Sequence, residues 1–228
     1  MTFLAHVLAP GGAGALARPG VVDVLTAWRF DLPVVLPTVA AGTLYALGAM
    51  RVAARYPGAP WPTGRSTAFF GGLALILLAL QSPVDVYSEV FLWVHMIQHL
   101  LLSMVVAPLL LLGAPITLAL RASPSRARRR FLLPVLHSVP VVALSNPLVA
   151  WLLFAGVMVG AHFSPLYEAA LENPWIHDVE HMLFLASGLL FWWPVVARDP
   201  SRWRMSHPVR LLYVIMAGPV NTFTALAI

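Results

Sequence analysis

The sequence predicts an all-α membrane protein, a bundle of about six transmembrane helices with its N-terminus on the extracytoplasmic side. Three observations support this. Hydrophobic residues make up 60% of the 228-residue chain, charged residues only 10%, and the mean hydropathy is +0.82. The apolar residues are gathered into long stretches, and the arginines lie in alternate connections between them. A soluble domain would carry about 25% charged residues.

Six apolar segments account for most of the chain, and each reaches the roughly 17 to 25 residues that a spanning helix needs. They cover residues 32–50, 67–83, 90–113, 147–164, 175–197 and 209–228. We therefore expect one transmembrane helical domain over residues 31–228 and an extracytoplasmic or interfacial segment over residues 1–30. The N-terminus lacks a basic region ahead of a short apolar stretch, so we expect no cleaved signal peptide.

A further stretch, RASPSRARRRFLLPVLHSVPVVALSNP, separates the third and fourth segments. Pro134 and Pro140 interrupt its apolar part, and proline inside a helix breaks or kinks it. The sequence therefore predicts a segment lying at the membrane interface instead of a seventh crossing.

The loop charges predict the orientation. All 14 basic residues are arginines, and all except Arg18 and Arg29 follow the first, third and fifth segments. These are Arg51, Arg55, Arg65, Arg121, Arg126, Arg128, Arg129, Arg130, Arg198, Arg202, Arg204 and Arg210. The other connections carry acidic residues and no basic one. The positive-inside rule places the arginine-bearing loops in the cytoplasm, so the positive charge indicates topology and not nucleic-acid binding.

Five of the eight histidines fall in the outer halves of three predicted helices. His95 and His99 lie four residues apart in the third segment, and His177 and His181 have the same spacing in the fifth. His162 lies at the outer end of the fourth. Residues at i and i+4 project from one helix face, so each pair can address a single ion or cavity. Ionisable groups inside a membrane are usually functional, whereas a lone histidine such as His162 can equally be a hydrogen-bonded packing residue.

The residue types suit a metal site. The chain has no cysteine, which excludes thiolate ligands and iron–sulfur clusters. Neutral imidazole binds copper, zinc or iron, and thioether sulfur from Met96 or Met182 would select Cu(I). Adjacent helical positions point about 100° apart, so both methionines are placed in a supporting role. Glu180 and Asn221 are candidates for orienting the imidazoles by hydrogen bonds.

Three stretches carry a resemblance to a known family: HMIQHLLLSMVVAPLLLLGAPI, NPLVAWLLFAGVMVGAHFSPLYEAAL and PWIHDVEHMLFLASGLLFWWPVV. They resemble the CtaG family of assembly proteins for caa3-type cytochrome c oxidase of bacteria. The resemblance implies a multi-pass plasma-membrane protein that assembles haem–copper oxidase by delivering copper to the catalytic subunit. Its expected partners are that subunit and the lipid bilayer. Together with this resemblance, the histidines predict a Cu(I) site formed by His95, His99, His162, His177 and His181. No catalytic residue is expected.

Two alternatives remain open at this stage. Transmembrane histidines on facing helices also ligate haem in b-type cytochromes. In addition, HDVEH matches the H-x-x-E-H zinc-protease pattern, in which Glu180 would be the general base of a membrane hydrolase.

Overall fold

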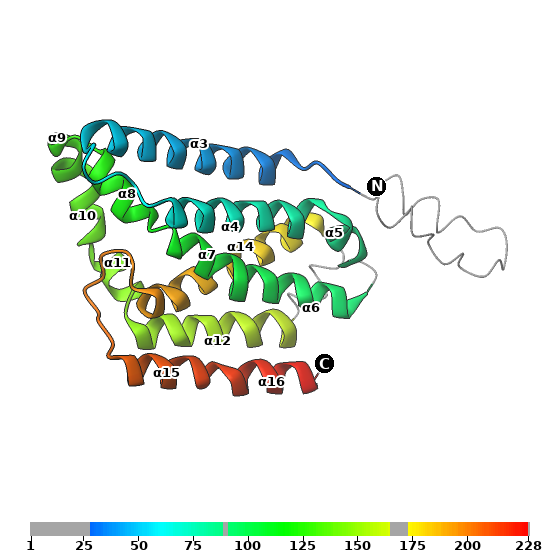
Figure 1. Cartoon of the computed structure of the whole chain (residues 1–228). Helices are drawn as coiled ribbons and strands as arrows, with labels where there is room; N and C mark the ends of the chain where they lie inside the picture. The colour runs from blue at the N-terminus through cyan, green and yellow to red at the C-terminus, as the bar shows by residue number, and fades with distance from the viewer. Residues whose placement is uncertain (1–27, 89–90, 165–172, 228) are drawn as a thin grey trace, which may run out of the picture.

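The structure, a computed structural model, describes residues 28–88, 91–164 and 173–227, and every regular element within them is a helix. The long helices lie side by side in one bundle (Figure 1). The bundle elements are α3 (Leu32–Arg55), α4 (Thr63–Gln81), α5 (Pro83–Ser88), α6 (Leu92–Leu100), η1 (Leu101–Val106), α7 (Ala107–Leu112), α8 (Pro115–Ala122), α12 (Pro147–Phe163), α14 (Pro174–Val196), α15 (His207–Ile215) and α16 (Ala217–Ala227). The predicted all-α class is confirmed for this part of the chain. The predicted N-terminal segment lies outside the described residues, apart from residues 28–30.

Four helical stretches within the described residues are long and apolar enough to cross a membrane. They are Leu32–Arg55, Thr63–Gln81, Leu92–Ala122 and Trp175–Val196. α12 is apolar but has 17 residues, the lower limit for a crossing. The last predicted segment is divided into α15 and α16 at Met216. The helix is interrupted there because Pro219, three residues further on, has no N–H to donate to the carbonyl of the preceding turn. The described chain is thus all-helical with four helices suited to cross a membrane, and the count of six crossings stays a prediction.

The stretch between the third and fourth segments forms four short helices at one end of the bundle (Figure 1). These are α9 (Ser125–Ala127), η2 (Arg128–Leu132), α10 (Leu133–Leu136) and α11 (Val139–Leu144). A crossing needs about 17 residues, so none of them is long enough to span a bilayer.

The arginine-bearing connections meet at this same end. The Arg121 guanidinium lies 5.4 Å from the ring centroid of Tyr56 and 5.7 Å from that of Trp61, and it donates to the Ala59 carbonyl. Asp199 accepts from the Thr117 N–H and hydroxyl, both at 2.7 Å, at the start of α8. Loops from three parts of the sequence are therefore joined at one end, as the charge pattern requires. Which side of the membrane this end faces stays a prediction.

Two apolar clusters hold the bundle together. In the first, Tyr45 of α3 stacks on Phe69 of α4 with ring centroids 4.0 Å apart and donates to the Gly113 carbonyl. In the second, Phe154 of α12 packs against Phe191 of α14 at 4.7 Å. α14 packs along η1 and α7, and α12 packs against α14. This arrangement brings the histidine-bearing parts of α6, α12 and α14 to the end opposite these arginine-bearing connections.

Candidate metal centre

The five predicted histidines lie together between three helices. His95 and His99 are on α6, His162 is in the last turn of α12, and His177 and His181 are in the first two turns of α14. We call them the histidine cluster. His95, His99 and His181 are buried, and His162 and His177 are partly buried.

Four of the five imidazole rings lie at the corners of a quadrilateral, each close to the next. Within the i, i+4 pairs, the ring centroids of His95 and His99 are 4.2 Å apart, as are those of His177 and His181. Between helices, His95 lies 5.3 Å from His177, and His99 lies 5.6 Å from His181. His162 joins at one corner, 6.0 Å from His99. The His95 and His99 pair on α6 therefore lies beside the His177 and His181 pair on α14.

Glu180 adds a carboxylate to the cluster. Its Oε2 lies 3.9 Å from Nε2 of His95, and one ligand atom each from His95, His177 and Glu180 lie within 4.8 Å of one another. Glu180 is 1% exposed, and neither of its oxygens has a hydrogen-bond partner. Both ring nitrogens of His99 and Nε2 of His181 are also buried without a hydrogen-bond partner. Buried polar atoms are rarely left without a partner, and such a set is what a bound cation satisfies.

A π-helical turn positions the α6 histidines against α14. η1 follows α6 directly after the His95 and His99 pair, and π-turns inside helices occur frequently at functional sites. The Ser103 carbonyl, in η1, accepts from Nε1 of Trp192 on α14 at 3.0 Å. The Ser103 hydroxyl donates to the His99 carbonyl at 2.7 Å. Ser103 therefore links the His99 backbone to the facing helix.

Phe184 closes one side of the cluster. Its ring stacks on His99 with centroids 3.9 Å apart and lies edge-on to His162 at 5.9 Å. His177, His181, Phe184 and Gly188 follow one another at helical spacings of four, three and four residues, so they share one face of α14. That periodicity is readable in the sequence, although the residues predicted from the sequence include neither Phe184 nor Gly188.

Of the two methionine candidates, only Met96 reaches the histidine cluster. The Met96 sulfur lies 3.0 Å from Nε2 of His162, whose Nδ1 is 2.7 Å from the Met158 carbonyl. A carbonyl only accepts, so Nδ1 of His162 donates, and in the neutral ring the Nε2 lone pair lies on the side of the sulfur. Met182 is 68% exposed and does not join the cluster. Met182 follows His181 directly, and the 100° helical step turns it away from that imidazole, so Met182 does not take the supporting role suggested for it.

Asn221, the remaining candidate, is in α16, but its side chain lies outside what the structure describes. His137 and His207 are exposed at the arginine-bearing end. His6 lies outside the described residues.

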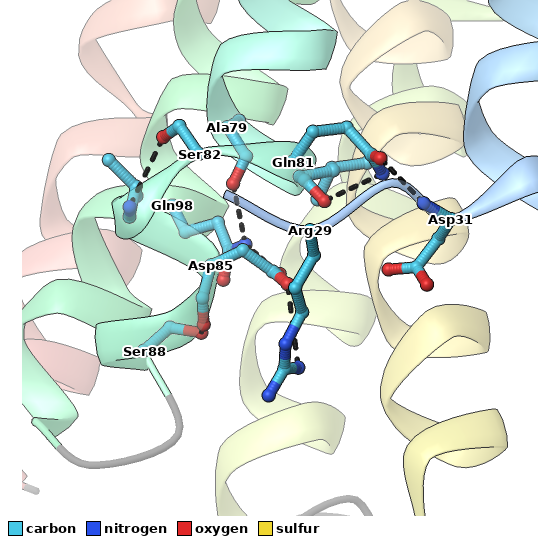
Figure 2. A network of polar contacts seen from close by, with 10 residues as sticks. Arg29, Asp31, Ala79, Gln81, Ser82, Asp85, Ser88 and Gln98 are labelled. Atoms are coloured by element: carbon cyan, nitrogen blue, oxygen red, sulfur yellow. Dashed lines mark hydrogen bonds and ion pairs between the residues drawn. The ribbon is translucent and has the colours of Figure 1, made fainter. Parts of the chain in front are cut away.

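A buried polar network, absent from the sequence-based predictions, holds α6 at Gln98 (Figure 2). Nε2 of Gln98 donates to the Ala79 carbonyl and to Oδ1 of Asp85, each at 2.9 Å. Oδ2 of Asp85 lies 3.8 Å from an Arg29 nitrogen. Gln98 is fully buried and adjacent to His99. The network fixes α6 to the end of α4 and to α5, and a lone glutamine within an apolar segment was the signal for it.

Comparison with known proteins agrees with the resemblance of the three stretches. A family model described as cytochrome c oxidase caa3 assembly factor matches residues 43–228. Uncharacterized proteins of Mycobacterium bovis and Mycobacterium tuberculosis are each 34% identical over 218 residues, and one of Mycobacterium leprae is 31% identical over 216 residues. Each alignment covers 92% of this chain and 32% of the relative, so the chain spans about a third of the length of these curated relatives. No solved structure matches the chain. With its paired histidines in place and the family model covering most of its length, the chain belongs to the CtaG family of caa3-type cytochrome c oxidase assembly factors.

Proposed function

We propose that the protein acts in the bacterial plasma membrane, where it binds copper at the histidine cluster and delivers it to the catalytic subunit of a haem–copper oxidase. Its family consists of cytochrome c oxidase assembly factors. The observation that carries the copper proposal is the meeting of five imidazoles from three helices, with buried nitrogens of His99 and His181 that have no hydrogen-bond partner.

The donor set favours Cu(I). Imidazole suits copper, zinc and iron, whereas thioether sulfur selects the soft Cu(I) ion. The Met96 sulfur and Nε2 of His162 lie 3.0 Å apart, so both donors are at one place. The site can therefore present nitrogen and sulfur to the same ion.

The compactness of the cluster favours an ion over haem. A b-type haem needs two histidines on opposite faces of a flat macrocycle. Here the rings that face one another across the helices lie 5.3 and 5.6 Å apart, and Phe184 is stacked on His99 at 3.9 Å. That spacing suits a single small ion, and a macrocycle would have to displace Phe184.

The distribution of the histidine ligands over three helices suits a protein that must release the copper it binds. Each histidine pair is rigid within its own helix, because both members are carried by the same turns of backbone. A small shift of α14 relative to α6 separates one pair from the other and reduces the number of ligands. Copper is thus captured by both pairs and released when they part.

Copper analysis of the purified protein tests the proposal. The protein is loaded with Cu(I) under reducing conditions in detergent, desalted, and its copper measured per chain. We expect the double variant His99→Ala with His181→Ala to lose bound copper. The matched control, His137→Ala with His207→Ala, removes two exposed histidines and is expected to retain it.

Equal copper in the two double variants would overturn the copper proposal. A Soret band in the purified protein would favour haem instead. The proposed role is non-catalytic, so peptide hydrolysis that is lost in Glu180→Gln would contradict it.

A further inference from the structure

A groove runs along the lipid-facing side of the bundle between α12 and α14. Its volume is about 340 Å³. α12 and its C-cap Ser164 contribute residues from Leu152 onward, a length of about 18 Å at the usual helical rise, and α14 contributes Glu180 and Leu183. Leu152 is 56% and Leu183 41% exposed, so the groove opens sideways into the region where lipid lies.

Two glycines form the open wall of the groove. Gly156 and Gly160 lie four residues apart on α12, in a G-x-x-x-G arrangement. A Cβ built on either would meet no atom within 4 Å apart from the neighbouring backbone of α12 itself, so no other described helix packs against them. In membranes, small residues at this spacing let the backbone of another helix approach closely.

Glu180 is a second sign of a ligand at the same place, because one carboxylate can face the histidine cluster with Oε2 and still leave Oε1 without a partner. It lines the groove, its side chain is 1% exposed, and neither carboxylate oxygen accepts a hydrogen bond. An acceptor buried at membrane depth is satisfied by a donor that enters the groove. The same carboxylate lies 3.9 Å from Nε2 of His95, so the groove leads to the histidine cluster.

We propose that this groove is the docking site for one transmembrane helix of the client oxidase subunit. The docking helix has a small residue facing Gly156 and Gly160 and a hydrogen-bond donor, such as an imidazole, at the depth of Glu180. This inference rests on the proposed function, because the client is the subunit that receives the metal. Docking there brings the client to the wall of the histidine cluster without passage through water.

The other occupants fit less well. A lipid acyl chain would fill the groove but offers no donor to Glu180. A second copy, paired around an axis along the membrane normal, would place the same residues at the same depth and set one Glu180 near another. A client helix with a donor satisfies both the small-residue wall and the carboxylate.

Site-directed photocrosslinking tests the docking. Benzoylphenylalanine is placed at Leu152, in the groove, or at Leu44, a 70% exposed position on α3. The full chain is co-expressed with the oxidase catalytic subunit of the same organism, and cross-linked peptides are identified by mass spectrometry. We expect the Leu152 probe, but not the Leu44 probe, to label a transmembrane segment of that subunit.

Filling the groove supplies the matched comparison. Gly156→Leu should abolish the cross-link, and Gly160→Leu is a second variant of the same kind. Gly71→Leu adds the same bulk on α4, where a Cβ also meets nothing within 4 Å, and should leave the cross-link intact. Glu180→Gln retains an acceptor oxygen and should preserve more of the cross-link than Glu180→Leu.

The outcomes separate this inference from the copper proposal. Cross-links only to lipid, or only to a second copy of this chain, would overturn the docking site. A cross-link to the oxidase subunit that is unchanged in Gly156→Leu and Gly160→Leu would also overturn it. Copper content is measured in the same samples, and we expect Gly156→Leu to bind copper normally. Normal copper without a groove cross-link defeats the docking inference alone, whereas a groove cross-link in a protein without copper defeats the copper proposal alone.

Discussion

A Cβ atom on Gly188 would lie 2.8 Å from both the Cα and the carbonyl oxygen of Ser103. Real Cβ atoms essentially never come this close to backbone, so α14 contacts η1 only because residue 188 has no side chain. Gly188 shares a face of α14 with His181. The close approach at Ser103 therefore sets the distance between the two histidine pairs, including the 5.6 Å between the His99 and His181 rings.

Gly188→Ala is expected to push α14 away from η1. The movement separates the histidine pairs and lowers the affinity for copper, and overpacking of this kind costs about 1–3 kcal/mol of stability. The measurements are copper affinity by competition with a Cu(I) chelator and the melting temperature in detergent. Gly71→Ala is the control, because its added methyl group meets nothing within 4 Å. Wild-type affinity in Gly188→Ala would show that this contact does not set the site.

Met96→Leu and Met182→Leu each remove one thioether sulfur, the first beside the histidine cluster and the second at an exposed position. Exchanges of methionine for leucine usually cost less than about 1.5 kcal/mol, so both variants should fold. We expect Met96→Leu to weaken Cu(I) binding and leave Zn(II) binding unchanged, because thioether sulfur favours the soft ion. The exposed Met182 should affect neither. Competition titrations with both metals distinguish the variants, and equal effects at the two positions would argue against a thioether ligand.

Gln98 should tolerate a hydrophobic substitution better than a charged one. Gln98→Leu loses the donors to Ala79 and Asp85, each hydrogen bond contributing about 1 kcal/mol. Gln98→Glu loses the same donors and also places a carboxylate beside Asp85 in a buried position, where like charges are costly. Melting temperatures in detergent should fall in the order wild type, Gln98→Leu, Gln98→Glu. The reverse order of the two variants would mean that Asp85 is not a fixed acceptor.

Asp199 is expected to act mainly as a hydrogen-bond acceptor at the start of α8. Burial raises the pKa of its carboxyl above the usual range, while the hydrogen bonds from Thr117 oppose that shift. Asp199→Ala leaves the N–H groups of Ile116 and Thr117 without this acceptor and should cost about 1–3 kcal/mol. Asp199→Asn retains an oxygen at the same place and should lose much less. Thermal unfolding of both variants checks this, and equal losses would show that the charge itself matters.

Much of the site was predictable from local sequence. The i, i+4 spacing of His95 with His99 and of His177 with His181 requires each pair to share a helix face, because 3.6 residues make one turn. The alternation of arginine-rich and acidic connections predicted that the histidines would lie at one end of the bundle. The prolines at positions 134 and 140 predicted that this stretch would not form a seventh crossing helix, and none of its helices is long enough to be one. These inferences succeeded because each depends only on residues near one another in the chain.

The sequence by itself determined the helical class, the apolar stretches long enough to cross a membrane, and which imidazoles share a face. Only the tertiary structure decided that the two pairs oppose one another, that Met96 and not Met182 reaches the cluster, and that Glu180 lies both beside His95 and in a lateral groove. The physical reason is that these relationships depend on how helices rotate and approach. That is set by contacts between residues distant in the chain, such as Gly188 with Ser103 and Gln98 with Asp85, which helical periodicity does not encode.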